Sequence, residues 1–412
     1  MRFIFIHPNF PAQFRHLVEF LGKNPKNKVI FITGSPRPEW KIPGVHKIIF
    51  NEEPLPENLY AGPLANFVQV RSKGEAVAKI LQKLKKKNFV PDLICGHSGW
   101  GSTLYVKDVF PETPFLGYFE WYYHERNINL TSEKKRVAGI DARIRARNRS
   151  LPILNDLVAC DHGFCPTKWQ KGHFPGEFHK KLSVIHDGIN TNFFSPAPDL
   201  KLKLPGLDLS SVKELVTYTS RGFEPYRGFP QFIESIPLIL EKRPKAHIVI
   251  VGEDRVCYGS QLPKGQSYKT LMREKVKLDP GQVHFVNSLP YGQYLQVLQA
   301  SSVHVYLTVP FVLSWSLLEA MACECLVVAS DTPPVREVIQ NGVNGVLTNF
   351  FSPEKIAEKV VACLEYPSFM QTVKKNARKT VLEKYGIDKM LPRQLHVIKQ
   401  LTEAANSKSL FG

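Results

Sequence analysis

The segment Val303–Gly345 constrains the fold of this 412-residue chain more than any other. It begins with a strand-like apolar run, Val303–Leu307, and continues through the turn Phe311-Val-Leu-Ser-Trp-Ser into a helical pattern that contains Glu319. A second apolar run, Leu326–Ser330, follows. This order predicts a strand–helix–strand unit of a parallel sheet, with the helix start and the carboxylate at the carboxyl ends of the strands, where open α/β folds bind nucleotides. The alternative is an ordinary core unit in which Glu319 binds nothing.

The motif Leu317-Leu-Glu-Ala-Met-Ala resembles the donor-site signature of retaining glycosyltransferases of family 4, which have the GT-B fold. The resemblance implies an α/β protein of two Rossmann-like domains that face each other across a cleft. In that family a Glu, seven residues and a second Glu precede Ala-Met-Ala, and the second Glu holds the nucleotide ribose. Glu319 matches the second Glu, whereas Phe311 occupies the position of the first. Because the first Glu normally lies beside the donor sugar, this departure bears on sugar identity and on catalysis.

A second family motif is found in Tyr218-Thr-Ser-Arg-Gly-Phe-Glu-Pro-Tyr-Arg-Gly, which resembles a loop whose Arg and Lys bind the donor diphosphate. The matching residues are Arg221 and Arg227, with one extra residue between them and Arg in place of Lys. Guanidinium groups suit this role because they stay charged and bind phosphate oxygens in bidentate fashion. The alternative is that both are ordinary surface arginines. The resemblance also assigns a phosphate and sugar subsite to the N–H groups of Val312, Leu313, Ser314, Trp315 and Ser316.

Length and composition agree with two domains, because 412 residues exceed one hydrophobic core and 43% are hydrophobic. The Pro-rich stretch Ser195–Pro205 is the best connector. We therefore expect an N-terminal acceptor domain at 1–194 and a C-terminal nucleotide-sugar-binding domain at 213–386. GT-B chains often return a last helix to the first domain, and residues 387–405 have a suitable pattern.

Two loops of the first domain offer further candidates. His97 follows a strand-like run and precedes a glycine-rich turn, and Glu120 follows the next run among aromatic residues. Family members often have His where Glu120 stands, so the resemblance makes Glu120 and His97 the catalytic candidates. The loop after the first strand contributes Phe10 and Gln13 as cleft residues, although it lacks the family's glycines. The alternatives are a hydrogen-bonded core histidine at His97 and a structural ion pair at Glu120.

The formal charge of +17 is concentrated in part in the run from Lys134 to Arg149, where Val137, Ile140 and Ile144 recur at helical spacing. Such a surface predicts peripheral contact with an anionic membrane or an acidic glycan, and the alternative is a solvated basic face. The sequence contains no recognition module for nucleic acid. No run approaches the length of a membrane span, and seven cysteines in mostly apolar surroundings favour reduced thiols and a cytoplasmic location.

Together these features predict a retaining, hexosyltransferase-type glycosyltransferase that moves a sugar from a UDP- or GDP-sugar to a glycan, lipid-linked or other acceptor, as in cell-envelope polysaccharide or glycolipid synthesis. The family resemblance implies that no metal or other cofactor is required besides this co-substrate, since the sequence shows no Asp-x-Asp donor motif. The alternative is a GT-B protein that binds glycan or lipid and has lost transfer.

Overall fold

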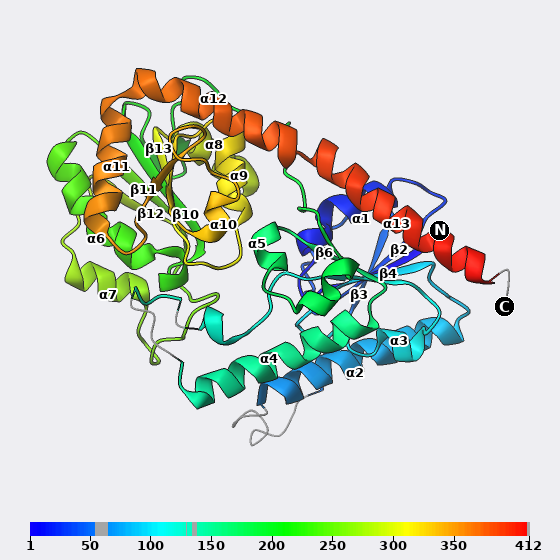
Figure 1. Cartoon of the computed structure of the whole chain (residues 1–412). Coiled ribbons are helices and arrows are strands. Elements are labelled where there is room, and N and C mark those ends of the chain that lie inside the picture. Colours follow the sequence, from blue (N-terminus) through cyan, green and yellow to red (C-terminus); the bar gives the residue numbers. More distant parts are fainter. Residues whose placement is uncertain (54–64, 129, 134–137, 410–412) are drawn as a thin grey trace. The chain divides into compact units, whose positions relative to one another are not determined.

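The computed structural model describes residues 1–53, 65–128, 130–133 and 138–409 (Figure 1). These residues form two compact units. Unit 1 takes in the described parts of Met1–Ile128, Arg136–Gly188 and Ile387–Gly412, and unit 2 those of Asn129–Lys135 and Ile189–Gly386. Lys134, Lys135, Arg136 and Val137 of the basic run lie outside the described residues. No helix in the described ranges is long and apolar enough to cross a bilayer.

Unit 1 is built on a seven-stranded parallel sheet with the strand order β3-β2-β1-β4-β5-β6-β7. The chain starts in the middle of this sheet, adds β2 and β3 on one side, and then returns to add β4 to β7 on the other. The order of the strands therefore reverses between β1 and β4. The strands are β1 (Arg2–Ile6), β2 (Lys28–Thr33), β3 (Val45–Ile49), β4 (Leu93–His97), β5 (Phe115–Tyr118), β6 (His162–Cys165) and β7 (Leu182–Val184).

Alternate residues of β1 supply the two cores of unit 1, because successive side chains of a strand point to opposite faces. Phe3 and Phe5 belong to the core that includes side chains of α1 (Arg15–Gly22) and α13 (Ile387–Ser409). Ile4 and Ile6 belong to the other, with side chains of α2 (Ala65–Lys86) and α4 (Ile140–Ala159). Shorter helical segments of unit 1 are η1 (Ala12–Phe14), α3 (Val106–Val109), η3 (Glu125–Asn127), α5 (Lys168–Lys171) and η4 (Gly176–Lys181).

The helix α13 completes unit 1 although it is the last helix of the chain. Its residues Met390, Val397 and Ile398 are buried in the same core as Phe3 and Phe5. Gln394 Nε2 donates to the carbonyl of His186 at 3.0 Å, which joins α13 to the segment that follows β7.

Unit 2 has a six-stranded parallel sheet with the strand order β12-β11-β10-β13-β14-β15, so the order reverses between β10 and β13. Its strands are β10 (Leu215–Gly222), β11 (His247–Glu253), β12 (Val283–Val286), β13 (Val303–Tyr306), β14 (Val327–Ser330) and β15 (Val346–Thr348). The connector before it forms a short antiparallel pair, β8 (Lys203–Leu204) and β9 (Leu207–Asp208).

Helices cover both faces of this second sheet. One core joins α6 (Phe229–Lys242) and α11 (Pro353–Glu365), and another joins α9 (Trp315–Ala322) and α12 (Pro367–Lys384). The remaining helical segments of unit 2 are η5 (Pro225–Arg227), α7 (Tyr268–Lys275), α8 (Tyr291–Gln299) and α10 (Pro333–Arg336). The predicted alternation of strands and helices is thus present in both units.

Candidate functional site

The first group of candidate residues lies where the strand order of unit 2 reverses. At such a point the connections leave two neighbouring strands in opposite directions, which opens a crevice at their carboxyl ends. Arg221 is the next-to-last residue of β10 and is exposed, while Thr308 follows β13 by two residues. The sheet therefore brings two loops to one edge. The loop after β10 carries Arg227, and the loop after β13 carries the turn at residues 311–316.

Arg227 is buried and is fixed by the loop that follows β13. Its Nη1 donates to Thr308 Oγ1 at 2.9 Å and to the carbonyl of Val312 at 3.0 Å. Gly228, the next residue, has a φ of +66°, and a Cβ there would lie 2.5 Å from Cβ of Leu307. Because only glycine fits this turn without strain, the sequence Arg-Gly places the guanidinium at the carboxyl edge of the sheet.

Two aromatic rings lie against the Arg227 guanidinium, and a third packs on one of them. Its Cζ lies 5.2 Å from the ring centroid of Tyr258 and 5.8 Å from that of Phe311. The Phe311 ring is in turn 5.3 Å from the ring of Tyr226 and 5.2 Å from that of Tyr258. We call Tyr226, Tyr258 and Phe311 the aromatic cluster. Phe311, which stands where the family has a carboxylate, is therefore packed against rings at the predicted diphosphate site.

Glu224 is a buried residue of this site to which the sequence motif assigned no role. Its Oε2 accepts from the backbone N–H groups of Tyr258 at 2.9 Å and Gly259 at 2.7 Å, and its Oε1 accepts from that of Cys257 at 3.2 Å. These bonds hold the loop after β11 so that Tyr258 covers Arg227. No local pattern could reveal this, because the acceptor and its donors are more than thirty residues apart.

The start of α9 is capped by its own serine. Ser314 Oγ accepts from the N–H of Ser316 at 3.4 Å, and the N–H of Ser314 donates to the Tyr306 hydroxyl at 2.8 Å. Serine is a preferred residue at this position because its oxygen satisfies an N–H that the helix leaves unpaired. The N–H groups of Ser314 and Ser316, both assigned to the phosphate subsite, therefore have partners within the protein. Val312 and Leu313 have buried side chains, so only their backbone could face a ligand.

Glu319 lies in the second turn of α9 and is largely buried. Its Oε2 accepts from the Tyr294 hydroxyl of α8 at 2.9 Å. Burial, together with the nearby carboxylate, raises the pKa of Tyr294 well above its usual range, so the phenol remains a donor. The Glu319 carboxylate is thus held in place as a hydrogen-bond acceptor. A residue that binds ribose must accept hydrogen bonds from the ribose hydroxyl groups.

The second group of candidates lies where the strand order of unit 1 reverses. His7 follows β1 and His97 ends β4, and their ring centroids are 4.7 Å apart. His97 Nδ1 is 2.9 Å from the carbonyl of Ser98, to which it donates a hydrogen bond. His97 Nε2 then faces Glu120 Oε2 at 3.6 Å, slightly beyond direct hydrogen bonding. The structure therefore brings together the two residues that the sequence proposed as catalytic.

Glu120 is positioned from both its backbone and its side chain. Gln13 Nε2 donates to Glu120 Oε1 at 3.1 Å, and Gln170 Nε2 donates to the carbonyl of Glu120 at 2.7 Å. The preceding residue, Phe119, is fully buried and lies directly over Gly117, where a Cβ would be 2.4 Å from its ring. Gln13 therefore lies beside Glu120 and His97. All three were named from the sequence as candidate residues of the first domain.

Phe10 differs from its prediction as a cleft residue. Its side chain is buried in the core of unit 1 and its ring meets that of Phe31 edge-on, with centroids 4.9 Å apart. The loop after β1 folds inward here because Phe10 is the large apolar side chain that can cover Phe31. Phe10 therefore acts in packing, and we assign it no contact with a ligand.

Asp156 is a further polar residue that sequence reasoning missed. It is fully buried on α4, and its Oδ2 accepts from Ser98 Oγ and Thr103 Oγ1, both at 2.7 Å. Burial raises the pKa of Asp156 to about 6, although these hydrogen bonds oppose the shift. Asp156 thereby anchors the turn that begins directly after His97. Among the described residues, no group of three or more His, Cys, Asp or Glu is arranged to hold a metal ion.

Comparison with known proteins agrees with this architecture. A family model described as glycosyl transferase family 4 group matches residues 25–194, and one described as glycosyl transferases group 1 matches residues 208–380. An uncharacterized glycosyltransferase of Methanocaldococcus jannaschii is 30% identical over 224 residues, which are 53% of this chain and 54% of that protein. The matched segment thus spans about half the length of this curated relative.

Two solved structures resemble the whole chain. HepE of Anabaena in complex with UDP has a TM-score of 0.70 at 15% identity, and the match covers 97% of this chain and 100% of HepE. Sucrose-phosphate synthase of Thermosynechococcus elongatus has a TM-score of 0.72 at 17% identity, with 98% and 100% covered. These similarities confirm the predicted GT-B fold. With both halves matched by its models, the chain belongs to the group 1 glycosyltransferases of family 4.

Proposed function

We propose that the chain is an active retaining glycosyltransferase that takes a sugar from a UDP- or GDP-sugar bound to unit 2. The observation that carries this proposal is the grouping of Arg221, Arg227 and Glu319 at the carboxyl edge of one parallel sheet, where its strand order reverses. That edge supplies cations for a diphosphate and a fixed carboxylate for a ribose.

The chemistry follows from where charge develops. As the glycosidic bond breaks, negative charge grows on the diphosphate that leaves. Arginine stabilises this charge without losing its proton, and a guanidinium fixed in advance needs no reorganisation during the reaction. Arg227 is fixed by Thr308 and Val312, whereas Arg221 is exposed and can turn toward the phosphates. We propose that the departing phosphate then helps to deprotonate the acceptor on the same face of the sugar, which retains the configuration.

The choice of donor is supported by HepE, whose structure contains UDP. We assign Glu120 and His97, with Gln13, to contacts with the transferred sugar or its acceptor, since their oxygen and nitrogen atoms suit sugar hydroxyls. We further propose a glycan or a lipid-linked molecule as the acceptor, a role in polysaccharide or glycolipid synthesis in the cytoplasm at the inner face of the membrane, and a reaction that requires no metal.

The test is release of UDP or GDP from a panel of nucleotide sugars, with water or added glycans as acceptor. We expect Arg221→Ala and Glu319→Ala to lower the rate by about a hundredfold or more, the size typical of lost charge stabilisation. Glu241→Ala and Lys242→Ala, an exposed pair at the far end of α6, are the matched controls and should leave the rate unchanged. Thermal unfolding of each variant checks that the fold persists.

Near-normal rates in both site variants would overturn the assigned roles. Calorimetry separates the remaining alternative from the proposal. If a nucleotide sugar binds the wild-type chain but its nucleotide is not released with any of the acceptors, the chain is a GT-B protein that binds without transfer.

A further inference from the structure

The outer face of α4 carries a line of exposed apolar side chains. An amphipathic surface helix normally turns its apolar side chains inward, and α4 does so with Ala146, Ile153 and Leu157. A second apolar line nevertheless faces solvent. Its members, with their exposed fractions, are Ile140 (64%), Ile144 (45%), Leu151 (43%), Leu154 (36%) and Val158 (64%).

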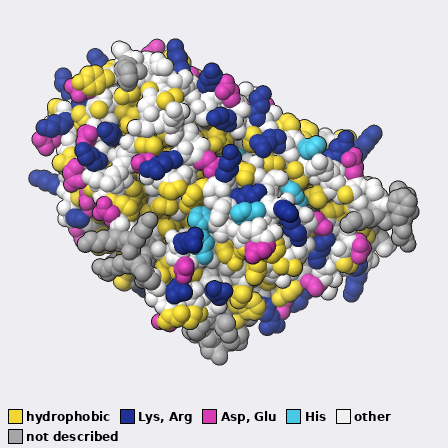
Figure 2. Space-filling model, in the orientation of Figure 1, with side chains coloured by type: hydrophobic (Ala, Val, Ile, Leu, Met, Phe, Trp, Pro, Cys, Tyr) yellow, Lys and Arg dark blue, Asp and Glu magenta, His cyan; other side chains and the backbone are white. Residues whose placement is uncertain are grey.

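The spacing of these five residues places them on one side of the helix. They follow one another by four, seven, three and four residues, which returns each to nearly the same direction at 3.6 residues per turn. We call them the α4 stripe. Contiguous exposed apolar surface of this kind marks a site that is covered by something else. Hydrophobic side chains interspersed with Lys and Arg are visible along the lower edge in Figure 2, where Figure 1 draws α4.

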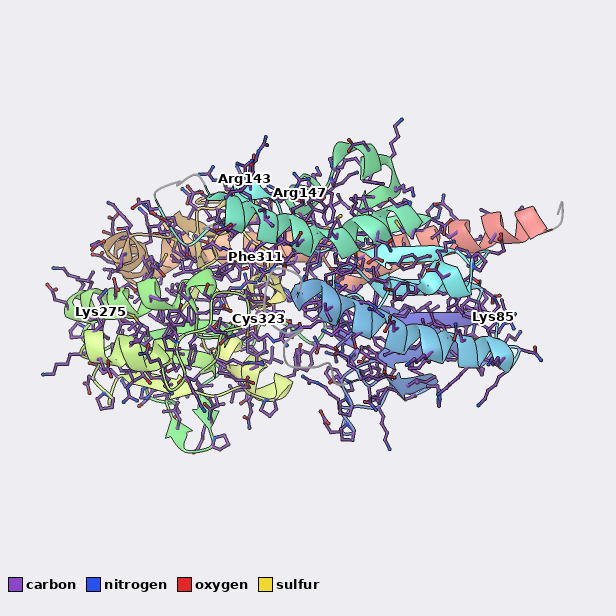
Figure 3. All side chains as sticks on the ribbon, turned by 90° about the horizontal axis from the view of Figure 1, so that it is seen from below. Lys85, Arg143, Arg147, Lys275, Phe311 and Cys323 are labelled. Atoms are coloured by element: carbon purple, nitrogen blue, oxygen red, sulfur yellow. The ribbon has the colours of Figure 1, made fainter. Side chains whose placement is uncertain are left out.

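Arginines accompany the stripe. Arg143, Arg145, Arg147 and Arg149 are all exposed on α4. At 3.6 residues per turn Arg143 and Arg147 lie on the side of the stripe, whereas Arg145 and Arg149 lie on the opposite side. Arg143 and Arg147 are labelled in Figure 3. Arg147, three residues after Ile144 and four before Leu151, lies within the stripe itself. Arg143 is 3.2 Å from Glu125, but both groups are about half exposed, so water weakens this pair. Within α4 itself the acidic residues are Asp141, in its first turn, and the buried Asp156.

The neighbouring helix also carries positive charge. The helix α2 packs against α4, and the exposed Lys83, Lys86 and Lys87 lie in its last turn and directly after it. This end of α2, which Figure 3 marks with Lys85, lies away from Arg143 and Arg147. At the carboxyl end of α4, Lys181 Nζ donates to the carbonyl of Cys160 at 2.9 Å. This contact places a cation at the negative end of the helix dipole.

We propose that α4 lies flat on an anionic lipid bilayer, with the α4 stripe in the boundary between headgroups and acyl chains and Arg143 and Arg147 on lipid phosphates. Helices with an apolar side and flanking Arg or Lys bind in this way, because long cationic side chains reach back to the headgroups. The inference deepens the proposed function, since it names the surface on which a lipid-linked acceptor would be met. The role of this surface in meeting an acceptor rests on the proposed function. Binding of α4 to lipid does not, because it requires no sugar transfer.

Charge favours a bilayer over a second copy of the chain. Two copies that paired through the α4 stripe would bring Arg143 and Arg147 of one copy against those of the other, and like charges at an interface repel. An anionic bilayer instead supplies phosphates, and each Arg or Lys near such a surface strengthens binding by roughly fivefold.

The experiment is flotation of the full-length chain with vesicles of 70% phosphatidylcholine and 30% phosphatidylglycerol, and with vesicles of phosphatidylcholine alone. We expect binding to the anionic vesicles that is strongly reduced by salt and nearly lost on the neutral ones. The combined substitution Ile144→Ser, Leu151→Ser and Val158→Ser should weaken binding on the order of a hundredfold. Arg143→Gln with Arg147→Gln should weaken it by roughly twenty-five-fold.

A matched control replaces exposed apolar residues elsewhere, Leu238→Ser and Leu382→Ser on α6 and α12, and should bind as the wild type does. Wild-type chain that stays unbound by anionic vesicles at 0.1 M salt would overturn the proposal, as would an α4-stripe variant that binds normally. A wild-type dimer that this variant converts to monomer would also overturn it. Nucleotide release with a water-soluble acceptor, measured on the same variants, should be unchanged and so distinguishes loss of binding from loss of the proposed activity.

Discussion

Glu224 gives the most direct test of how the diphosphate site is held. Its carboxylate accepts three backbone N–H groups from one short loop, two on Oε2 and one on Oε1. That loop places Tyr258 over the Arg227 guanidinium. Glu224→Gln keeps the shape of the side chain, but it removes the charge and replaces one acceptor by an amide N–H₂. If the carboxylate holds the loop, this change must loosen it.

The magnitude follows from the three bonds. A hydrogen bond to a charged group contributes about 1.5–3 kcal/mol, against about 1 kcal/mol for a neutral one. The two N–H groups on Oε2 keep a neutral acceptor and so lose about 1 kcal/mol each. The N–H of Cys257 would face a donor and lose its bond, although water can reach this half-buried loop and recover part of the loss. We expect the loop to open more easily by about 3 kcal/mol, or on the order of a hundredfold.

Amide hydrogen exchange measures this opening directly. The N–H groups of Cys257, Tyr258 and Gly259 should exchange on the order of a hundredfold faster in Glu224→Gln, while those of the buried strand β11 should change little. The matched control is Glu358→Gln, which removes an exposed carboxylate that pairs only with Lys355 and Lys359 on α11. Exchange of the three amides within twofold of the wild-type rate would refute the role that we give to Glu224.

Two further predictions concern unit 2. Phe311→Glu should leave the dissociation constant of UDP within about threefold of the wild-type value, because the phosphate-binding arginines remain. It should change the dissociation constant of a UDP-sugar by about tenfold or more. Calorimetry with UDP and UDP-glucose checks this, and equal changes for both ligands would contradict it. Burial lowers the pKa of His304, which is hydrogen-bonded to Thr217, to about 3. Between pH 6.5 and 3 the unfolded chain therefore binds a proton that the folded chain does not, so stability falls as the pH falls through this range. Urea unfolding should show that the wild type loses about 2 kcal/mol more than His304→Gln between pH 6.5 and pH 5; identical pH profiles would contradict this.

Much of the architecture could be read from local patterns. The apolar runs Val303–Leu307 and Leu326–Ser330 form β13 and β14 almost as expected, because buried parallel strands are continuous apolar segments between turns. The positions of Glu319 and Arg227 relative to these strands also followed from short motifs. Gln13, Glu120 and His97 became candidates through the family resemblance and their places after strand-like runs. They lie together because the carboxyl ends of parallel strands meet at one edge of the sheet.

Other features depend on contacts between distant parts of the chain and left no local signal. Glu224 and Asp156 look like ordinary polar residues in the sequence, and their roles appear only when the loops that they bind are in place. Phe10 was assigned to a cleft because the family resemblance places the loop after the first strand there, yet its large apolar ring is buried against Phe31. Only Ile140 and Ile144 of the α4 stripe were noted from the sequence. The structure shows that the stripe continues beyond Pro152 to Leu154 and Val158.

The return of α13 to unit 1 has a consequence for synthesis on the ribosome. The described strands and helices of unit 2 run from β8 to α12, so the ribosome has made that unit before it reaches Ile387. The sheet of unit 1 is made first, but its Phe3 and Phe5 face lacks Met390, Val397 and Ile398 until the last helix emerges. The lobe whose translation begins first is therefore the one whose core closes last, and until then its uncovered aromatic face is a surface that chaperones would recognise.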